Sequence, residues 1–518
     1  MGHYSAFLSF MQRVHVASPA QERMSRDLSS LFEAVYAERP ILRTLIAQHG
    51  TRTLHEYASQ YVANTVYPVT RRNEIIGVIV RETERLFGAE LSRTISEQLN
   101  REYVVNTADH VGPVTHSWFV STSALIGATL PQGSRAIITL ACSNVSLNNT
   151  SFPRGLLFHT QKGSKICEQR LSFLPSDSHA ASVYGFRAYT RDEIHKIHKL
   201  LREKVRAHDV PQSVADKLVT LIDTVYGTES VLSQASFADQ VSTTNRTLWQ
   251  QMFSGEQVPE LVYLEQERVV IDALIRFHLT GNSVVSKILF KPDYTALAAT
   301  HFDGVPSAYV HSEKKGTFLF WGASKDNSYR VSLWYKDGAL ESADGTVRIP
   351  LTPESITRAL NEKRIVPSLL LTFILLSFYY GLNCLGGFNQ INYVTAMKAA
   401  YLSFLLARSE TDEYTLASRA VTDNTNDVTL GYVHDGTALI PADGLDFYLY
   451  GTGTAWAHLV SDVHTLTLRD AFFPGMPTFY RCTRPASQLD PTLSSITPAH
   501  ITQHFGVDEK LTPTVSLS

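Results

Sequence analysis

The sequence predicts an α+β fold in which an N-terminal helical region is followed by mixed sheet segments with buried helices, without internal repeats. Apolar residues recur three and four apart across residues 21–100, which is the period of amphipathic helices. From about residue 102 the pattern changes to short β-type runs separated by glycine and proline. Helical and strand patterns do not alternate regularly enough to predict a barrel or a doubly wound sheet.

The chain is long enough for more than one domain, since 518 residues is roughly three times the commonest domain size. The patterns divide it into a mostly helical region over residues 1–100, an α/β segment over 101–235, and an α+β segment over 260–518. Residues 228–260 are rich in Ser, Thr and Gln and predict a loop-bearing connection. That connection is the best candidate for a domain boundary.

Helix starts are marked by capping residues. Thr190 and Glu193 have the spacing of a capping box, and an apolar stripe follows them, so we predict a helix over 191–207. Thr352 followed by Pro353 predicts another helix start, because proline suits the first helical position. The remaining predicted helices cover residues 213–226, 353–363 and 391–408.

Strands are predicted where short apolar or β-branched runs lie between turn residues. Residues 316–338 alternate around a polar turn at 324–328, which is typical of a β-hairpin. The other runs that predict strands cover residues 103–105, 118–120, 135–140, 156–158 and 447–450.

Composition limits the classes of partner. The chain is 44% hydrophobic and 18% charged, which excludes wholesale disorder. The formal net charge is −3 with both signs interspersed, so the chain lacks the positive field that nucleic-acid binding requires. We therefore expect a small-molecule ligand and no nucleic acid, and the sequence does not indicate an oligomeric state.

Cysteine usage and the N-terminus both predict a cytoplasmic protein. The four cysteines lie far apart without CxxC pairing, which matches neither a disulfide framework nor a cysteine-based zinc site. Residues 1–15 place Gln12 and Arg13 too early for the apolar stretch of a secretory signal peptide.

Residues 365–388 contain no charged side chain and approach the length of a membrane span. Pro367 and Gly381 shorten the continuously apolar part to about 15 residues, which is nearer to a buried core helix. Burial in the core is therefore the preferred interpretation, and membrane insertion is the alternative.

A loop around residues 109–116 contains the residues best suited to catalysis. It places Asp109, His110 and His116 directly after an apolar strand, where functional loops often lie. His110 can act as a general base, oriented by Asp109 or another carboxylate, because imidazole titrates near neutral pH. Alternatively, His110 and His116 can ligate a divalent metal across the turn, although their spacing matches no standard metal motif. In the non-functional interpretation, both rings only bond the turn.

Two further segments contain candidate substrate-binding residues. Asn149 and Arg154 lie in a polar loop over 144–155, where a planar guanidinium can hold a carboxylate or phosphate. The same loop can instead use its side chains to cap its own backbone. Gln390 and Tyr393 follow a glycine pair at a predicted helix start, whose free amides can hold an anion. The glycines can equally serve only a tight turn.

These observations predict an enzyme of the hydrolase or group-transferase type that acts on a small polar or anionic substrate through the 109–116 loop. The alternative is a non-catalytic binding or interaction protein, associated with a membrane if residues 365–388 insert. The chain contains neither GxxxxGK[ST] nor GxSxG, so no complete catalytic signature selects a reaction. The only cofactor that the residues suggest is a divalent metal.

Overall fold

The computed structural model is 54% helix and 16% strand with several small sheets, which confirms the predicted α+β class. It describes residues 19–61, 67–163, 165–175, 180–324, 329–434, 439–511 and 514–517. Residues 1–18 lie outside this range, and they include the residues from which the absence of a secretory signal peptide is predicted.

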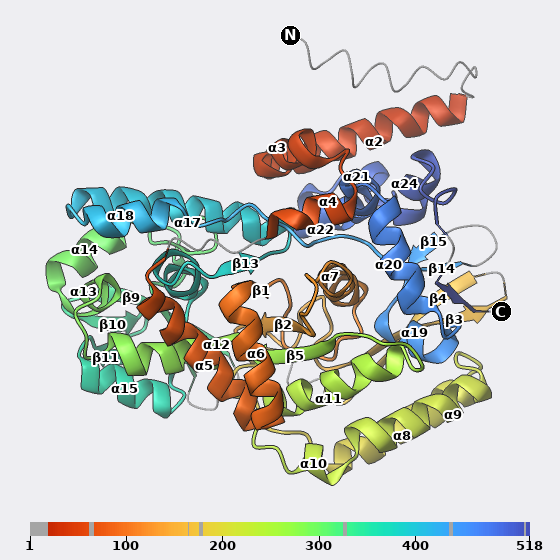
Figure 1. Ribbon diagram of the computed structural model, residues 1–518, viewed down its shortest axis with the longest axis horizontal. Helices are drawn as coiled ribbons and strands as arrows, with labels where there is room; N and C mark the ends of the chain where they lie inside the picture. The colour runs from red at the N-terminus through yellow and green to blue at the C-terminus, as the bar shows by residue number, and fades with distance from the viewer. Residues whose placement is uncertain are drawn as a thin grey trace.

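The N-terminal region is helical, as its apolar period predicts, and its elements are α2 (Pro19–Glu38), α3 (Pro40–His49), α4 (Leu54–Ala58), η1 (Ser59–Tyr61), α5 (Val69–Phe87) and α6 (Ala89–Arg101). The helix α5 packs on α6, and both lie beside the central sheet (Figure 1). Each helix buries one apolar stripe, so the spacing of apolar residues in the sequence was enough to predict both helices.

A four-stranded parallel sheet crosses the molecule in the order β13-β1-β2-β5 (Figure 1). Its strands are β1 (Val104–Asn106), β2 (Ala136–Ala141), β5 (Glu260–Glu265) and β13 (Asn383–Leu385). All three neighbouring pairs are parallel. The sheet therefore joins strands from the 101–235 and 260–518 segments. The sequence did not predict a parallel sheet, because two of its strands are only three residues long.

This sheet separates two hydrophobic cores, and successive residues of its strands face them in turn. In β2, Ile137 packs in one core and Ile138 in the other, and in β5 Leu261 and Val262 divide in the same way. A parallel sheet covered on both faces needs continuous apolar runs, which explains why β2 is buried throughout.

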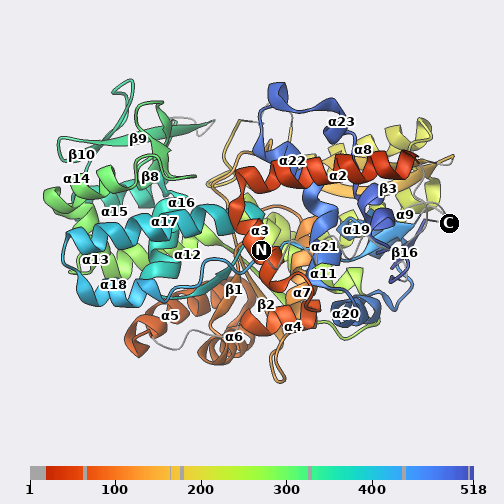
Figure 2. The ribbon, with the colours of Figure 1, turned by 90° about the horizontal axis from the view of Figure 1, so that it is seen from above.

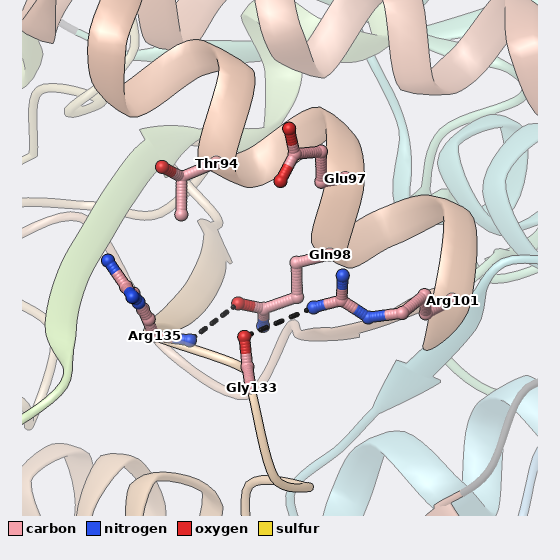
Figure 3. A pocket seen from close by; sticks show the side chains of 6 residues that line it. All are labelled: Thr94, Glu97, Gln98, Arg101, Gly133 and Arg135. Atoms are coloured by element: carbon pink, nitrogen blue, oxygen red, sulfur yellow. Dashed lines mark hydrogen bonds between the residues drawn. The ribbon is translucent and has the colours of Figure 1, made fainter.

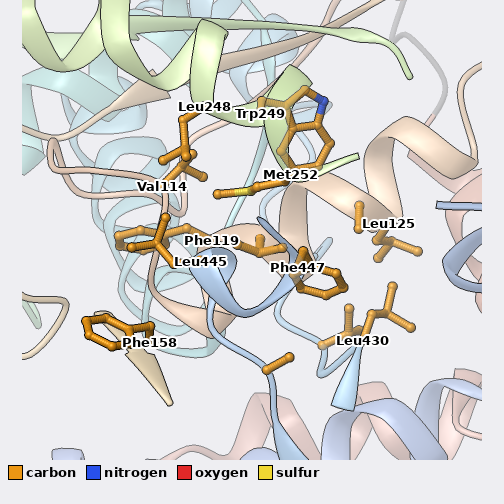
Figure 4. Packing of buried hydrophobic residues seen from close by; sticks show 14 of the residues in the cluster. Val114, Phe119, Leu125, Phe158, Leu248, Trp249, Met252, Leu430, Leu445 and Phe447 are labelled. Atoms are coloured by element: carbon orange, nitrogen blue, oxygen red, sulfur yellow. The ribbon is translucent and has the colours of Figure 1, made fainter. Parts of the chain in front are cut away.

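Helices that follow the sheet fill both cores. Figure 4 shows Phe119, Trp249 and Phe447 meeting in the first core, and they come from α7 (Ser117–Ala128), α11 (Phe237–Met252) and α19 (Gly444–Tyr450). The second core lies under α5 and α17 (Phe388–Ala407), and Figure 2 shows α13 to α18 gathered at that side.

Three predicted elements were wrong. Residues 118–120 and 447–450 are helical, in α7 and α19, instead of extended, and the predicted connection at 228–260 contains α10 (Glu229–Leu232) and α11. α7 is buried on most of its surface, so its apolar residues show no clean helical stripe. α11 does have apolar residues at helical spacing, Phe237, Val241, Leu248 and Met252, but the polar residues between them favoured the interpretation as a loop. In α11, polar residues such as Gln240 and Asn245 bond neighbouring backbone inside the protein, so a polar composition did not mean a loop.

The capping signals identified helix starts correctly. The capping box of Thr190 and Glu193 begins α8 (Arg191–Arg206), and Thr352 caps α15 (Pro353–Asn361). The helix predicted over 213–226 forms α9 (Gln212–Leu221) and the π-helix η3 (Ile222–Tyr226).

The predicted hairpin is formed by β8 (Phe320–Ala323) and β9 (Arg330–Lys336), which pair antiparallel. Four residues of its turn, 325–328, lie outside the described range. The hairpin belongs to a five-stranded sheet with β10 (Ala339–Ser342), β11 (Arg348–Pro350) and β12 (Ile365–Pro367).

The apolar segment 365–388 is buried but is not a single helix. It contains β12, the short helix α16 (Leu369–Phe373), the π-helix η5 (Ile374–Tyr379) and β13. None of the helices that the structure describes combines the length and the apolar character needed to cross a membrane.

The remaining elements complete the two sides of the molecule. Between β2 and β13 the chain also forms β3 (Gly155–Lys162), β4 (Lys165–Ser172), α12 (Gln266–Ala273), η4 (Leu274–His278), α13 (Val284–Phe290), α14 (Pro292–His301), β6 (Tyr309–Val310) and β7 (Lys315–Gly316). The C-terminal part contains α18 (Thr411–Ser418), β14 (Tyr432–His434), β15 (Leu439–Pro441), α20 (Ala455–Thr465), α21 (Leu468–Phe472), η6 (Phe473–Gly475), α22 (Met476–Thr483), η7 (Ala486–Gln488), α23 (Pro491–Ser494), α24 (Pro498–His504) and β16 (Val515–Ser516).

Gly381 makes the turn between η5 and β13, and we predict that Gly381→Ala strongly destabilises the protein. Its φ is +70°, and an added Cβ would overlap the ring of Tyr67, whose hydroxyl is bonded to the carbonyls of Phe378 and Leu416. Gly338→Ala is the matched control, because Gly338 has φ +71° but open space around it.

In urea unfolding, the control should lose about 1–2 kcal/mol from its positive φ alone. Gly381→Ala should lose about 1–3 kcal/mol more, the usual cost of overpacking. Equal losses in the two variants would show that the contact with Tyr67 is unimportant.

Candidate active site at the carboxyl edge of the parallel sheet

Polar residues lie at or just after the carboxyl ends of three strands of the central sheet. Asn106 ends β1, Ser143 follows β2 and Glu265 ends β5, whereas β13 is followed by Gly386. Ligands of parallel α/β sheets bind outside the carboxyl ends of the strands, because loops from several strands converge there. We therefore expect functional residues at this edge.

His110 lies at this edge with its ring half-buried and oriented by Asn149. Its Nδ1 is 3.0 Å from Asn149 Oδ1, and Tyr263 donates a 2.7 Å hydrogen bond to its carbonyl. The backbone N–H of Ser151 donates to the same Asn149 oxygen at 3.1 Å, which fixes the amide with its oxygen toward the imidazole. His110 Nδ1 must then be the donor, so the lone pair of the neutral ring is at Nε2.

Burial lowers the pKa of His110 below its usual 6.5. The imidazole is therefore neutral at pH 7, and a neutral ring with a free lone pair is the form that a general base requires. Two residues that were predicted separately, His110 and Asn149, are thus brought together by the fold. The orienting group is an amide, whereas the sequence suggested a carboxylate.

The 109–116 and 144–155 loops pack closely against each other next to His110 and Asn149. A Cβ added to Gly112 would lie 2.8 Å from Pro153 Cα, so the 109–116 loop reaches the 144–155 loop only with glycine at this position. The next residue, Arg154, has its guanidinium 5.4 Å from the ring of Phe152, and Arg170 approaches the same ring at 5.4 Å. Burial, together with the charge of Arg170, lowers the pKa of Arg154. Arg154, which is predicted to bind substrate, therefore lies close to a second cation, Arg170.

Asp109 faces the core and does not bond His110. Its Oδ1 accepts from Asn106 Nδ2 at 2.9 Å and from Thr122 Oγ1 at 3.4 Å, and Asn426 donates to Asn106 at 2.9 Å. Its Oδ2 accepts no hydrogen bond from the part of the chain that the structure describes. Burial raises the pKa of Asp109 to about 7. Asp109 is thus a buried acid in a polar network, and its predicted catalytic role stays a prediction.

His116 caps the start of α7. Its Nδ1 accepts a hydrogen bond from the backbone N–H of Trp118 at 3.2 Å, and burial lowers its pKa to about 4. The ring of Phe119 lies 6.1 Å from His110 and 5.5 Å from His116, measured between ring centroids. Both histidines therefore contact one aromatic side chain.

No group of three metal-ligand side chains among the described residues contains His110 or His116. Such a group exists elsewhere, at His159, Asp443 and Asp446. Metal ligation by His110 and His116 therefore stays a prediction, without a third protein ligand from the described residues.

The start of α17 is occupied by a carboxylate of the chain itself. Asp427 Oδ2 accepts from the N–H of Phe388 at 2.9 Å, and burial raises the pKa of Asp427 to about 6. Gln390 donates to Thr107 Oγ1 at 2.6 Å and so ties α17 to the loop after β1. Tyr393 is half-buried with its ring 6.0 Å from Phe373, and burial raises its pKa. One of the amides expected to hold an anion, that of Phe388, thus already has an internal partner.

Sequence reasoning missed Glu267, the most densely bonded acid of this edge. Its Oε1 accepts from Cys142 Sγ at 3.2 Å and from the N–H of Asn144 at 3.0 Å. Its Oε2 accepts from both the N–H and the Oγ of Ser143 at 2.7 Å. Burial raises the pKa of the Cys142 thiol well above its usual range, so this thiol is a poor nucleophile. An acidic residue three positions after the apolar run 261–264 was the available signal.

Two pockets lie away from His110. One of about 220 Å³ is at the amino end of β2, where Gln98 accepts from the N–H of Arg135 and Arg101 donates to Gly133 (Figure 3). The other, of about 320 Å³, has Asn106 in its lining. Neither is lined by a predicted catalytic or binding residue.

Comparison of the sequence with models of known protein families and with curated protein sequences finds no match.

Proposed function

We propose that this protein is an enzyme of the hydrolase or group-transferase type that acts on a small polar or anionic substrate, with His110 as its general base. The observation that supports this proposal is the contact of His110 Nδ1 with Asn149 Oδ1 at 3.0 Å. It holds the imidazole in the tautomer whose Nε2 can accept a proton. A histidine that served only packing would not need an amide fixed by a separate backbone N–H.

The substrate class follows from the charges beside the loop. Arg154 and Arg170 approach the same ring of Phe152, and Phe152 donates its N–H to the carbonyl of Asn149 at 3.0 Å. Guanidinium groups bind carboxylates and phosphates through paired N–H donors. Arg170 also pairs with Glu168 at 2.6 Å, so an anionic substrate would compete with an internal carboxylate.

In the proposed reaction, Nε2 of His110 removes a proton from water or from a substrate hydroxyl, and the resulting oxygen nucleophile attacks the carbonyl or phosphoryl centre. The Nδ1 proton stays on the ring and bonds Asn149, which stabilises the imidazolium that forms. The same imidazolium can then return its proton to the leaving group.

The pH dependence of hydrolysis tests this proposal. With p-nitrophenyl acetate and p-nitrophenyl phosphate as probes, we expect one of them to be hydrolysed with kcat/KM rising through an ionisation below pH 6.5. The rate should be level at pH 7–8, because the lowered pKa of His110 means that the base is lost only in more acidic solution. Hydrolysis of neither probe by the folded chain, or a rate that does not fall in acid, would contradict the proposal.

A further inference from the structure

His159, Asp443 and Asp446 form a compact cluster of possible metal ligands between β3 and α19. One ligand atom from each residue lies within 4.8 Å of the others, and all three side chains are buried. Their exposed fractions are 7%, 4% and 0%. His159 is in β3, Asp443 directly precedes α19, and Asp446 is in its first turn.

The cluster has an unsatisfied atom that faces its centre. Asp446 accepts from His159 Nδ1 at 2.6 Å and from the backbone N–H groups of His159 and Asp443 at 2.7 and 2.8 Å. Asp443 Oδ1 accepts from the N–H of Ser117 at 3.1 Å, which orients its carboxylate. The other oxygen, Asp443 Oδ2, has no hydrogen-bond partner among the described residues and lies 3.8 Å from His159 Nδ1.

A buried, ionised carboxylate oxygen without a hydrogen-bond donor raises the free energy of the folded state, because the charge is removed from water without a compensating partner. One imidazolium can balance only one of the two carboxylates, so a buried negative charge would remain if both acids were ionised. A divalent cation would neutralise both carboxylates and use the free oxygen.

We infer that His159, Asp443 and Asp446 bind one divalent first-row transition-metal ion, with Zn²⁺ and Mn²⁺ as the candidates. Metal bonds of about 2.0–2.2 Å in tetrahedral geometry place neighbouring ligand atoms about 3.4 Å apart. The distances of 2.6 and 3.8 Å from His159 Nδ1 to the two aspartates lie on either side of that value. Small rotations of these side chains would therefore complete the site.

The ligand set selects the class of ion. An imidazole nitrogen with two carboxylates suits Zn²⁺ and Mn²⁺, whereas Mg²⁺ and Ca²⁺ prefer shells made only of oxygen. On binding, the Nδ1–H bond to Asp446 is replaced by Nδ1–metal and Oδ2–metal bonds, and any proton held by the cluster is released to solvent. Three protein ligands leave a further position for water.

The site would also connect three parts of the chain. Ser117 begins α7, His159 lies in β3, and the aspartates begin α19, whose Tyr450 donates to the His159 carbonyl at 2.8 Å. None of the three ligands belongs to the set proposed for catalysis. Failure of this inference would therefore leave the role of His110 standing.

The test is calorimetric titration of the full, chelator-treated protein with ZnCl₂ and with MnCl₂, and with MgCl₂ for comparison. We expect one Zn²⁺ or Mn²⁺ per chain and weaker binding of Mg²⁺. Asp443→Asn keeps the acceptor for Ser117 but replaces the free oxygen with an amide. It should weaken binding at least about 100-fold, since loss even of an outer-shell partner costs 10–100-fold.

His198→Gln is the matched control, because His198 of α8 pairs with Asp223 of η3 at 2.9 Å, is not part of the cluster and should not affect binding. If Asp443→Asn does not fold by circular dichroism, electron spin echo spectroscopy of the Mn²⁺-loaded wild-type chain should detect an imidazole nitrogen. Absence of binding by the folded wild-type chain, unchanged binding by folded Asp443→Asn, or Mn²⁺ without a coupled nitrogen would overturn the inference.

Discussion

Replacement of His110 by glutamine is expected to lower kcat/KM for the hydrolysed probe by about 10²–10⁴-fold, the usual contribution of a general base. Glutamine keeps an amide donor that can bond the Asn149 oxygen, so the loop should retain its structure. It has no group that can accept a proton near neutral pH. The measurement is steady-state hydrolysis at pH 7.5, with circular dichroism to confirm the fold.

Two further variants separate catalysis from structure. His198→Gln removes a histidine that pairs with Asp223 and lies outside both polar loops, and it should hydrolyse the probe at the wild-type rate. Asn149→Asp places a carboxylate beside His110 Nδ1. The carboxylate favours the imidazolium, so the fall of kcat/KM in acid should begin at a higher pH. A wild-type rate in His110→Gln, or an acid limb unmoved in Asn149→Asp, would exclude the proposed base.

Replacement of Glu267 by alanine is expected to lower the free energy of unfolding by about 2–6 kcal/mol. Its two oxygens accept four hydrogen bonds, and two of the donors are the buried backbone N–H groups of Ser143 and Asn144. Alanine would leave both N–H groups without a partner, and each buried unsatisfied group costs about 1–3 kcal/mol.

The matched control is Glu256→Ala. The side chain of Glu256 also accepts from two backbone N–H groups, those of Trp456 and Ala457, but it is half-exposed. Water can replace its oxygens there, so the control should lose only about 1 kcal/mol, as for loss of a helix cap. Urea denaturation of both variants gives the comparison. A loss of about 1 kcal/mol in both would mean that Glu267 is not needed to satisfy the buried loop.

Local signals predicted local structure. The capping box of Thr190 and Glu193 and the cap at Thr352 gave correct helix starts, because each motif satisfies free amides within its own first turn. Apolar patterning failed at residues 118–120 and 447–450, which were predicted as strands and lie in the helices α7 and α19. Both helices are surrounded by other elements. Their apolar residues are therefore distributed around the helix and do not repeat with the helical period.

The candidate site shows the same division. The sequence by itself determined that Asp109, His110 and Asn149 lie in polar loops after apolar strands, since that order is a property of neighbouring residues. It did not determine that Asn149, 39 residues away, bonds His110, or that Asp109 faces Asn106 and Thr122. Only the tertiary structure decided these contacts, because the parallel pairing of β1 with β2 and β13 brings loops together whose sequences contain no signal of one another.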